Sequence, residues 1–215
     1  MQPRNAGWIC CATLLALLGA GCAGGPSVVA GPDYLAERGR SGVLVVPGPR
    51  DPDSMAAARD VGRLLAAELA TRWFNVLDFD AVVMSSPDLE PLLLRMAAQT
   101  LAGQLVDREA AEALLRRHRV GQLLVLDVFR SEQYWGRVTK ITRVGVEARL
   151  LELAEGRLLW QGRYAPEVSG SAGYGFDAAT RRVVRELVRV LSNGRPELKD
   201  TPMADWPILE HFTPN

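Results

Sequence analysis

Few residues of this 215-residue chain carry side chains suited to catalysis. His118 and His211 are the only histidines, and neither lies near a second ligand at the spacing that a metal site requires. Asp78 and Asp80 could form a carboxylate pair on one face of a strand, but no second reactive group lies nearby in the sequence. The chain has no G-x-S-x-G nucleophile elbow and no Walker phosphate loop. We therefore expect a protein that is not an enzyme and that uses neither a cofactor nor a metal.

The three cysteines lie together at the start of the chain, as Cys10, Cys11 and Cys22. Cys10 and Cys11 lie within an uncharged run, Trp8 to Leu18, which follows Arg4 and is too short to span a bilayer as a helix; Cys22 follows the run. This arrangement is typical of a signal peptide, which we place at residues 1–21. The rest of the chain has no cysteine, so it can form no disulfide bond.

The residues before Cys22 resemble a lipobox, the motif at which lipoprotein signal peptidase cuts once the cysteine has received a diacylglycerol. They read Gly19-Ala20-Gly21, whereas a lipobox usually has leucine where Gly19 stands. The resemblance implies a lipid anchor on Cys22 in the bacterial cell envelope, facing the periplasm. The residue after the cysteine is Ala23 and not the aspartate that marks inner-membrane retention in enteric bacteria, which points to the outer membrane. The alternative is ordinary secretory cleavage near Gly21 or Ala23, which would leave a soluble periplasmic protein.

The charges of the chain balance, with 25 basic and 25 acidic residues. Such a chain has no net field that would attract nucleic acid or an anionic membrane surface, so we expect no nucleic-acid partner. Residues 22–41 are rich in glycine, proline, alanine and serine and show no periodicity, which predicts a flexible lipidated tether.

Hydrophobic periodicity predicts one domain over residues 42–194. We expect strands at 42–47, 74–79, 122–129, 144–153 and 158–164, and helices at about 52–72, 89–96, 107–119 and 177–192. This order, β-α-β-α-α-β-β-β-α, predicts an α/β fold with a single mixed sheet of about five strands backed by helices. Residues 195–215 would form a C-terminal tail, either disordered or lying along the domain as an apolar strap.

Two segments resemble parts of a known type of envelope lipoprotein. Residues 120–125 (VGQLLV) look like its step from a helix through glycine into an apolar strand, and residues 148–160 look like its late hairpin. With the lipobox and the order of elements, the chain resembles lipoproteins of the curli-secretion and penicillin-binding-protein-activator type. The resemblance implies an anticodon-binding-like α/β domain that serves as an assembly or regulatory module.

Two large aromatic residues beside cations form the candidate partner-binding group, namely Tyr134, Trp135 and Arg137. The alternative is that both aromatics cover the end of the sheet while the cations face water.

Three classes of function follow. The first is a membrane-anchored, non-enzymatic module that binds another envelope protein. The second is an oligomeric component of an outer-membrane secretion assembly, in which each subunit would contribute membrane-spanning strands. The charges of Arg137, Lys140 and Arg143 argue against that class. The third is an enzyme of unknown chemistry, which a screen for hydrolase activity would reveal.

Overall fold

A computed structural model of the chain describes residues 27–31, 34–37, 41–73, 75–104, 106–135, 140–170 and 175–193. The predicted signal peptide, Cys22, Arg137, His211 and the C-terminal tail lie outside these residues. Within the described part of the chain, no helix combines the length and the apolar character needed to cross a bilayer.

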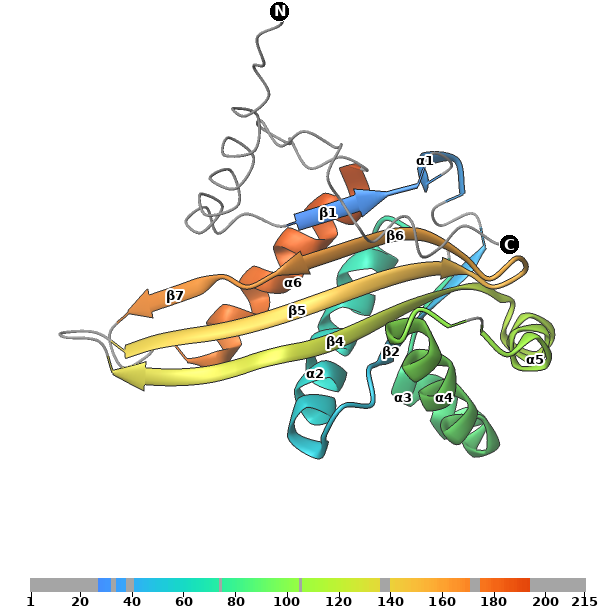
Figure 1. Ribbon diagram of the computed structural model, residues 1–215, viewed down its shortest axis with the longest axis horizontal. Coiled ribbons are helices and arrows are strands. Elements are labelled where there is room, and N and C mark those ends of the chain that lie inside the picture. Colours follow the sequence, from blue (N-terminus) through green and yellow to red (C-terminus); the bar gives the residue numbers. More distant parts are fainter. Residues whose placement is uncertain are drawn as a thin grey trace, which may run out of the picture.

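The core of the fold is one mixed sheet of seven strands (Figure 1). The strands are β1 (Ser27–Ala30), β2 (Gly42–Pro47), β3 (Val76–Asp78), β4 (Val120–Trp135), β5 (Lys140–Glu152), β6 (Arg157–Tyr164) and β7 (Glu167–Gly170). Their order is β1-β6-β5-β4-β2-β3, with β7 paired to β5. β2 is parallel to β3 and β4, and the other neighbours are antiparallel. The predicted α/β class with a single mixed sheet is confirmed, with β1 and β7 as additional strands.

Helices cover both faces of the sheet. They are α1 (Tyr34–Glu37), α2 (Pro52–Ala70), α3 (Phe79–Ser85), the 3-10 turn η1 (Pro87–Leu89), α4 (Glu90–Leu101), α5 (Arg108–His118) and α6 (Phe176–Asn193). Buried side chains of α2 and α6 form one core with alternate residues of β2, β4 and β5, and those of α3, α4 and α5 form a second core on the opposite face of β2 and β4. Over β5 and β6 that opposite face carries charged and amide side chains instead.

Aspartate side chains fix where three of the helices begin. Asp51 accepts a hydrogen bond from the Ser54 amide at 2.9 Å, and Asp107 accepts one from Ala110 at 3.2 Å. Asp78 caps α3 in the same way, through the Ala81 amide at 2.8 Å. Asp78 and Asp80 therefore do not share one face of a strand, because Asp80 lies in the first turn of α3.

The N-terminal segment differs from the prediction of a flexible tether up to residue 41. β1 pairs with β6 over Ser27–Ala30, and Val28 is 6% exposed. Tyr34 is fully buried, and its hydroxyl donates a hydrogen bond to the Leu191 carbonyl of α6. These elements of four residues each are too short to show a hydrophobic period, so composition alone suggested a linker.

The β4–β5 hairpin is longer than predicted. The two strands pair from Gln122↔Glu152 to Trp135↔Lys140, with a bulge at Phe129. Figure 1 shows these strands, with β7, extending past the helices toward one end of the molecule. Residues 130–135 are exposed or half-buried, so the apolar pattern that marks a strand is missing there.

Candidate functional site

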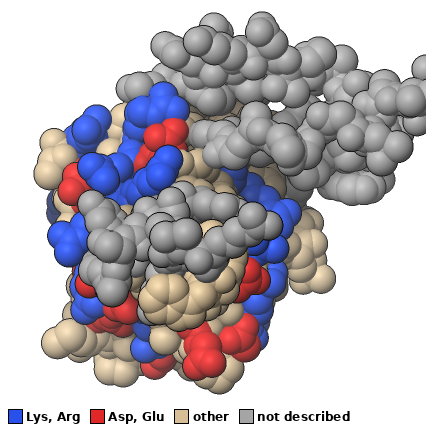
Figure 2. Space-filling view, turned by 90° about the vertical axis from the view of Figure 1, so that its left-hand side faces the viewer, with Lys and Arg blue, Asp and Glu red and all other residues tan. Residues whose placement is uncertain are grey.

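The end of the β4–β5 hairpin carries two of the three predicted partner-binding residues. Trp135 is 71% exposed and Tyr134 is 37% exposed, and they are the last two residues of β4. Arg137 lies outside the described residues. Figure 2 views the molecule from this end and shows charged side chains of both signs among uncharged ones. Most of the Trp135 side chain is thus exposed to solvent, which favours partner binding over the alternative that it covers the end of the sheet.

A cation–π contact orients the ring of Tyr134. The guanidinium carbon of Arg143 on β5 lies 5.0 Å from the centre of that ring. Tyr134 and Arg143 lie on the same face because the register pairs Tyr134 with Ile141 and Glu132 with Arg143. The ring is therefore held on one face of the hairpin, while Trp135 points to the other face.

The bulge joins this end of the hairpin to the body of the sheet. A Cβ atom on Gly145 would lie 2.7 Å from the Phe129 ring, so the ring lies directly across a glycine. The Arg163 guanidinium lies 4.0 Å from the centre of the same ring. The glycine opposite the bulge leaves room for the Phe129 ring to pack on the sheet.

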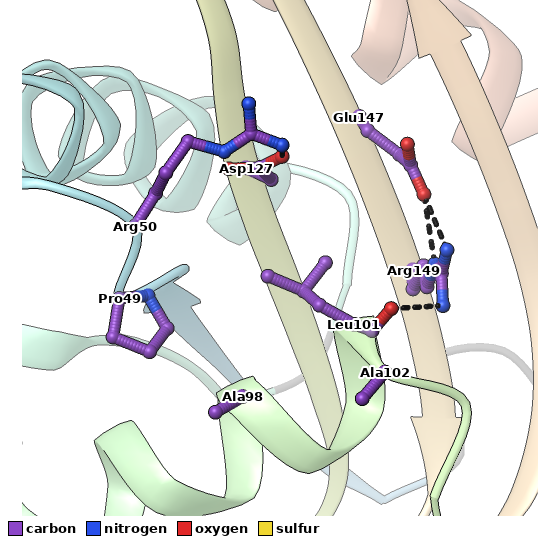
Figure 3. Close-up of a pocket in the computed structure, with 8 residues that line it drawn as sticks. All are labelled: Pro49, Arg50, Ala98, Leu101, Ala102, Asp127, Glu147 and Arg149. Carbon is purple, nitrogen blue, oxygen red and sulfur yellow. Dashed lines mark hydrogen bonds and ion pairs between the residues drawn. The ribbon is translucent and has the colours of Figure 1, made fainter.

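A second candidate site is a cavity of about 350 Å³ beside the C-terminal end of α4 (Figure 3). Its walls are Pro49 and Arg50 after β2, Ala98, Leu101 and Ala102 at the end of α4, Asp127 on β4, and Glu147 and Arg149 on β5. It lies at the carboxyl end of β2, where ligands of open α/β sheets commonly bind. None of these residues was predicted as a site. The sequence feature that could have pointed to this cavity is Asp127, a charged residue within the apolar run from Leu123 to Phe129.

Two ion pairs line this cavity. Arg149 contacts Glu147 at 2.7 Å, and it also donates to the Thr100 and Leu101 carbonyls at 2.8 and 3.1 Å. It thereby joins β5 to the C-terminal end of α4, where a cation is favoured by the helix dipole. Arg50 contacts Asp127 at 2.9 Å. The two carboxylates balance the two guanidinium groups, so the cavity offers hydrogen-bonding groups without a net charge.

Asp127 is the most unusual group of the cavity. It is 4% exposed, and its Oδ1 atom is buried without a hydrogen-bond partner among the described residues. Burial raises the pKa of the Asp127 carboxyl above its ordinary value, and the charge of Glu147 acts in the same direction, while Arg50 and Arg149 oppose them. Such a carboxylate costs stability in the folded chain when it is ionised.

Asp127→Asn is therefore expected to stabilise the fold at pH 7, by about 1 kcal/mol and a few degrees in Tm. Because the folded pKa lies above the unfolded one, the folded wild type takes up its proton first as the pH falls. As the pH falls through the pKa of Asp127 in the folded state, the wild type therefore gains stability. The advantage of Asp127→Asn over the wild type shrinks accordingly. Thermal unfolding between pH 4 and pH 8 measures both effects.

The matched control is Asp60→Asn. Asp60 forms an exposed pair with Arg63 at 2.6 Å, and we expect this change to shift stability by less than about 0.5 kcal/mol. A loss of stability in Asp127→Asn at pH 7 would show instead that the ion pair with Arg50 outweighs the cost of burial.

His118 lies in the last turn of α5 and is half-buried. Arg119 follows in the left-handed conformation, with φ of 55°, and ends the helix. His118 thus lies at a helix C-terminus, where a cationic side chain is favoured by the helix dipole. Among the described residues, no three histidine, cysteine or acidic side chains are grouped as a metal site would require.

No protein-family model and no curated protein matches the sequence. Solved structures with a similar fold include lipoprotein GNA1162 from Neisseria meningitidis, 20% identical over 71% of this chain and 99% of that chain, with a TM-score of 0.47. They also include the PelC dodecamer from Paraburkholderia phytofirmans, 16% identical over 78% of this chain and 94% of that one, with a TM-score of 0.45. Likeness at this level carries no conclusion about function, and the similarity to the curli-secretion and penicillin-binding-protein-activator type stays a prediction.

Proposed function

We propose that this chain is a lipid-anchored module of the bacterial cell envelope that binds another envelope protein through the end of its β4–β5 hairpin. The observation that carries the proposal is the 71% exposure of Trp135 at the end of a hairpin that extends past the helices (Figure 1). Tryptophan and tyrosine are the residues that most often supply the binding energy of a protein interface. Because the Tyr134 ring is already held against Arg143, it loses less conformational entropy on binding than a free side chain would.

The anchor in this proposal is a diacylglycerol on Cys22, facing the periplasm and held in the outer membrane. Because β1 begins at Ser27, the chain between the lipidated cysteine and the sheet can span at most about 20 Å. The domain would then lie close to the membrane surface and would not stand off it on a long tether. A partner is accordingly expected in or beside the same membrane.

The double variant Tyr134→Ala/Trp135→Ala tests the docking surface. Cells that express the wild type or the variant are crosslinked, the membranes are solubilised, and the proteins that co-purify are quantified. We expect the variant to reduce capture of the main partner at least tenfold, since loss of a central aromatic residue commonly costs about 2 kcal/mol or more of binding energy.

Met84→Ala is the matched control, because Met84 is 84% exposed on α3, which follows the edge strand β3 and is not part of the hairpin. Thermal unfolding of both variants should resemble that of the wild type. Equal capture by the double variant, or equal loss in Met84→Ala, would contradict the proposed surface.

A second candidate function is an oligomeric component of a secretion assembly. One observation favours it: in the described residues, β2 pairs with β4 only as far as Leu126, so the remainder of β4 has an unpaired edge. Exposed strand edges pair readily with other chains. The mass of the detergent-solubilised protein distinguishes a single copy from a larger assembly, and a heat-resistant oligomer on an SDS gel would favour this second function.

A further inference from the structure

The part of β4 beyond Leu126 is a strand edge that carries a positive and a negative side chain on either side of one serine. It pairs with β5 on one side through Trp135↔Lys140, and no described strand lies on its other side. Figure 1 shows β4 at the border of the sheet at this end, with the tip of the strand beyond the helices. Its backbone N–H and C=O groups on that side therefore need water or another strand as partner.

Arg130 and Glu132 flank Ser131 on this edge and point to the same face. Their side chains are 43% and 51% exposed, and they lie 3.5 Å apart within the chain. A strand with opposite charges on either side of one residue complements its own antiparallel copy. When two such strands pair with their Ser131 residues opposite one another, each Arg130 faces the Glu132 of the other copy.

We propose that two copies of this chain associate through antiparallel pairing of their β4 edges, with a two-fold axis at Ser131. The two sheets then form one continuous sheet. The interface is isologous, so each charge pair occurs twice. Other registers lack this match, since an axis at Glu132 would set the two Glu132 side chains against each other.

The pairing is short and centred on residues 130–132. The bulge at Phe129 interrupts the alternation of β4 on one side of them, and Gly48 already lies beside Leu126 and Asp127 on the outer side of the strand. The inference concerns the backbone edge and its charges, so it does not depend on partner binding by the aromatic side chains.

A cysteine at the axis tests the register directly. Ser131 is exposed, and in the proposed dimer its Cβ atom lies about 5 Å from that of the other copy, within reach of a disulfide bond after small adjustment. Membranes from cells that express full-length Ser131→Cys are oxidised and run on a non-reducing gel. We expect a dimer band in this variant, and none in the wild type or in Gln133→Cys, which would face Phe129.

Charge reversal supplies the second arm of the test. In the Ser131→Cys background, Arg130→Glu or Glu132→Arg alone places like charges opposite each other twice, and we expect about a tenfold loss of the dimer. The double reversal restores the match and should restore the band. Absence of the band in Ser131→Cys, equal crosslinking in Gln133→Cys, or no rescue by the double reversal would overturn the proposal. The Tyr134→Ala/Trp135→Ala variant should keep partial crosslinking, which separates this inference from the docking proposal.

Discussion

Replacement of Tyr34 by alanine is expected to lower the free energy of unfolding by about 3–5 kcal/mol, as for other large buried aromatic residues. Tyr34 is fully buried in the core formed with α2 and α6. Its hydroxyl donates to the Leu191 carbonyl, so the variant loses both packing and a buried hydrogen bond. Chemical denaturation of the full chain measures the change.

Tyr34→Phe separates the two contributions, because it keeps the ring and removes only the hydroxyl. We expect it to cost about 1 kcal/mol, the usual value for one hydrogen bond. A loss below about 1 kcal/mol in Tyr34→Ala would mean that residues 27–37 do not unfold together with the domain, and the corrected N-terminal boundary would then be wrong.

Replacement of Cys22 by alanine is expected to release the protein almost completely from the membrane fraction. Two or more acyl chains give stable attachment because each buried CH₂ group contributes about 0.8 kcal/mol, and the variant has no atom to carry them. Immunoblots of membrane and soluble fractions, together with metabolic labelling by a fatty acid, measure the effect.

Cys11→Ala is the control for this prediction, since Cys11 lies within the predicted signal peptide and cleavage after Gly21 would remove it. It should leave both fractionation and labelling unchanged. Retention of Cys22→Ala on membranes without acyl label in the wild type would instead favour ordinary secretory cleavage near Gly21 or Ala23.

Local signals in the sequence predicted most of the elements correctly. Asp51 and Asp107 are recognisable N-cap residues, and the helices begin directly after them. The hairpin turn before Arg157 and the apolar run of β2 were equally clear. Each of these features is determined by residues a few positions apart in the chain, so it can be recognised from one sequence.

The features that the sequence did not reveal depend on distant partners. β1 is a strand only because it pairs with β6, and the distal half of β4 only because it pairs with β5. The cavity is a clearer case, since Asp127 and Arg50 are far apart in the chain and come together only when β4 lies beside β2. The exposure of Trp135 likewise depends on the length of the hairpin. The sequence did not reveal that length, because residues 130–135 lack the apolar pattern of a buried strand.

Site-specific photocrosslinking at position 135 tests the central claim most directly. A photoreactive phenylalanine analogue replaces Trp135 in the full-length chain, and living cells are irradiated before their membranes are analysed. The docking proposal predicts one dominant adduct to a different envelope protein, and no such adduct when the analogue replaces Leu115, which is 51% exposed on α5. Lack of an adduct at position 135, or the same adducts from both positions, would contradict the claim that the end of the β4–β5 hairpin binds a partner.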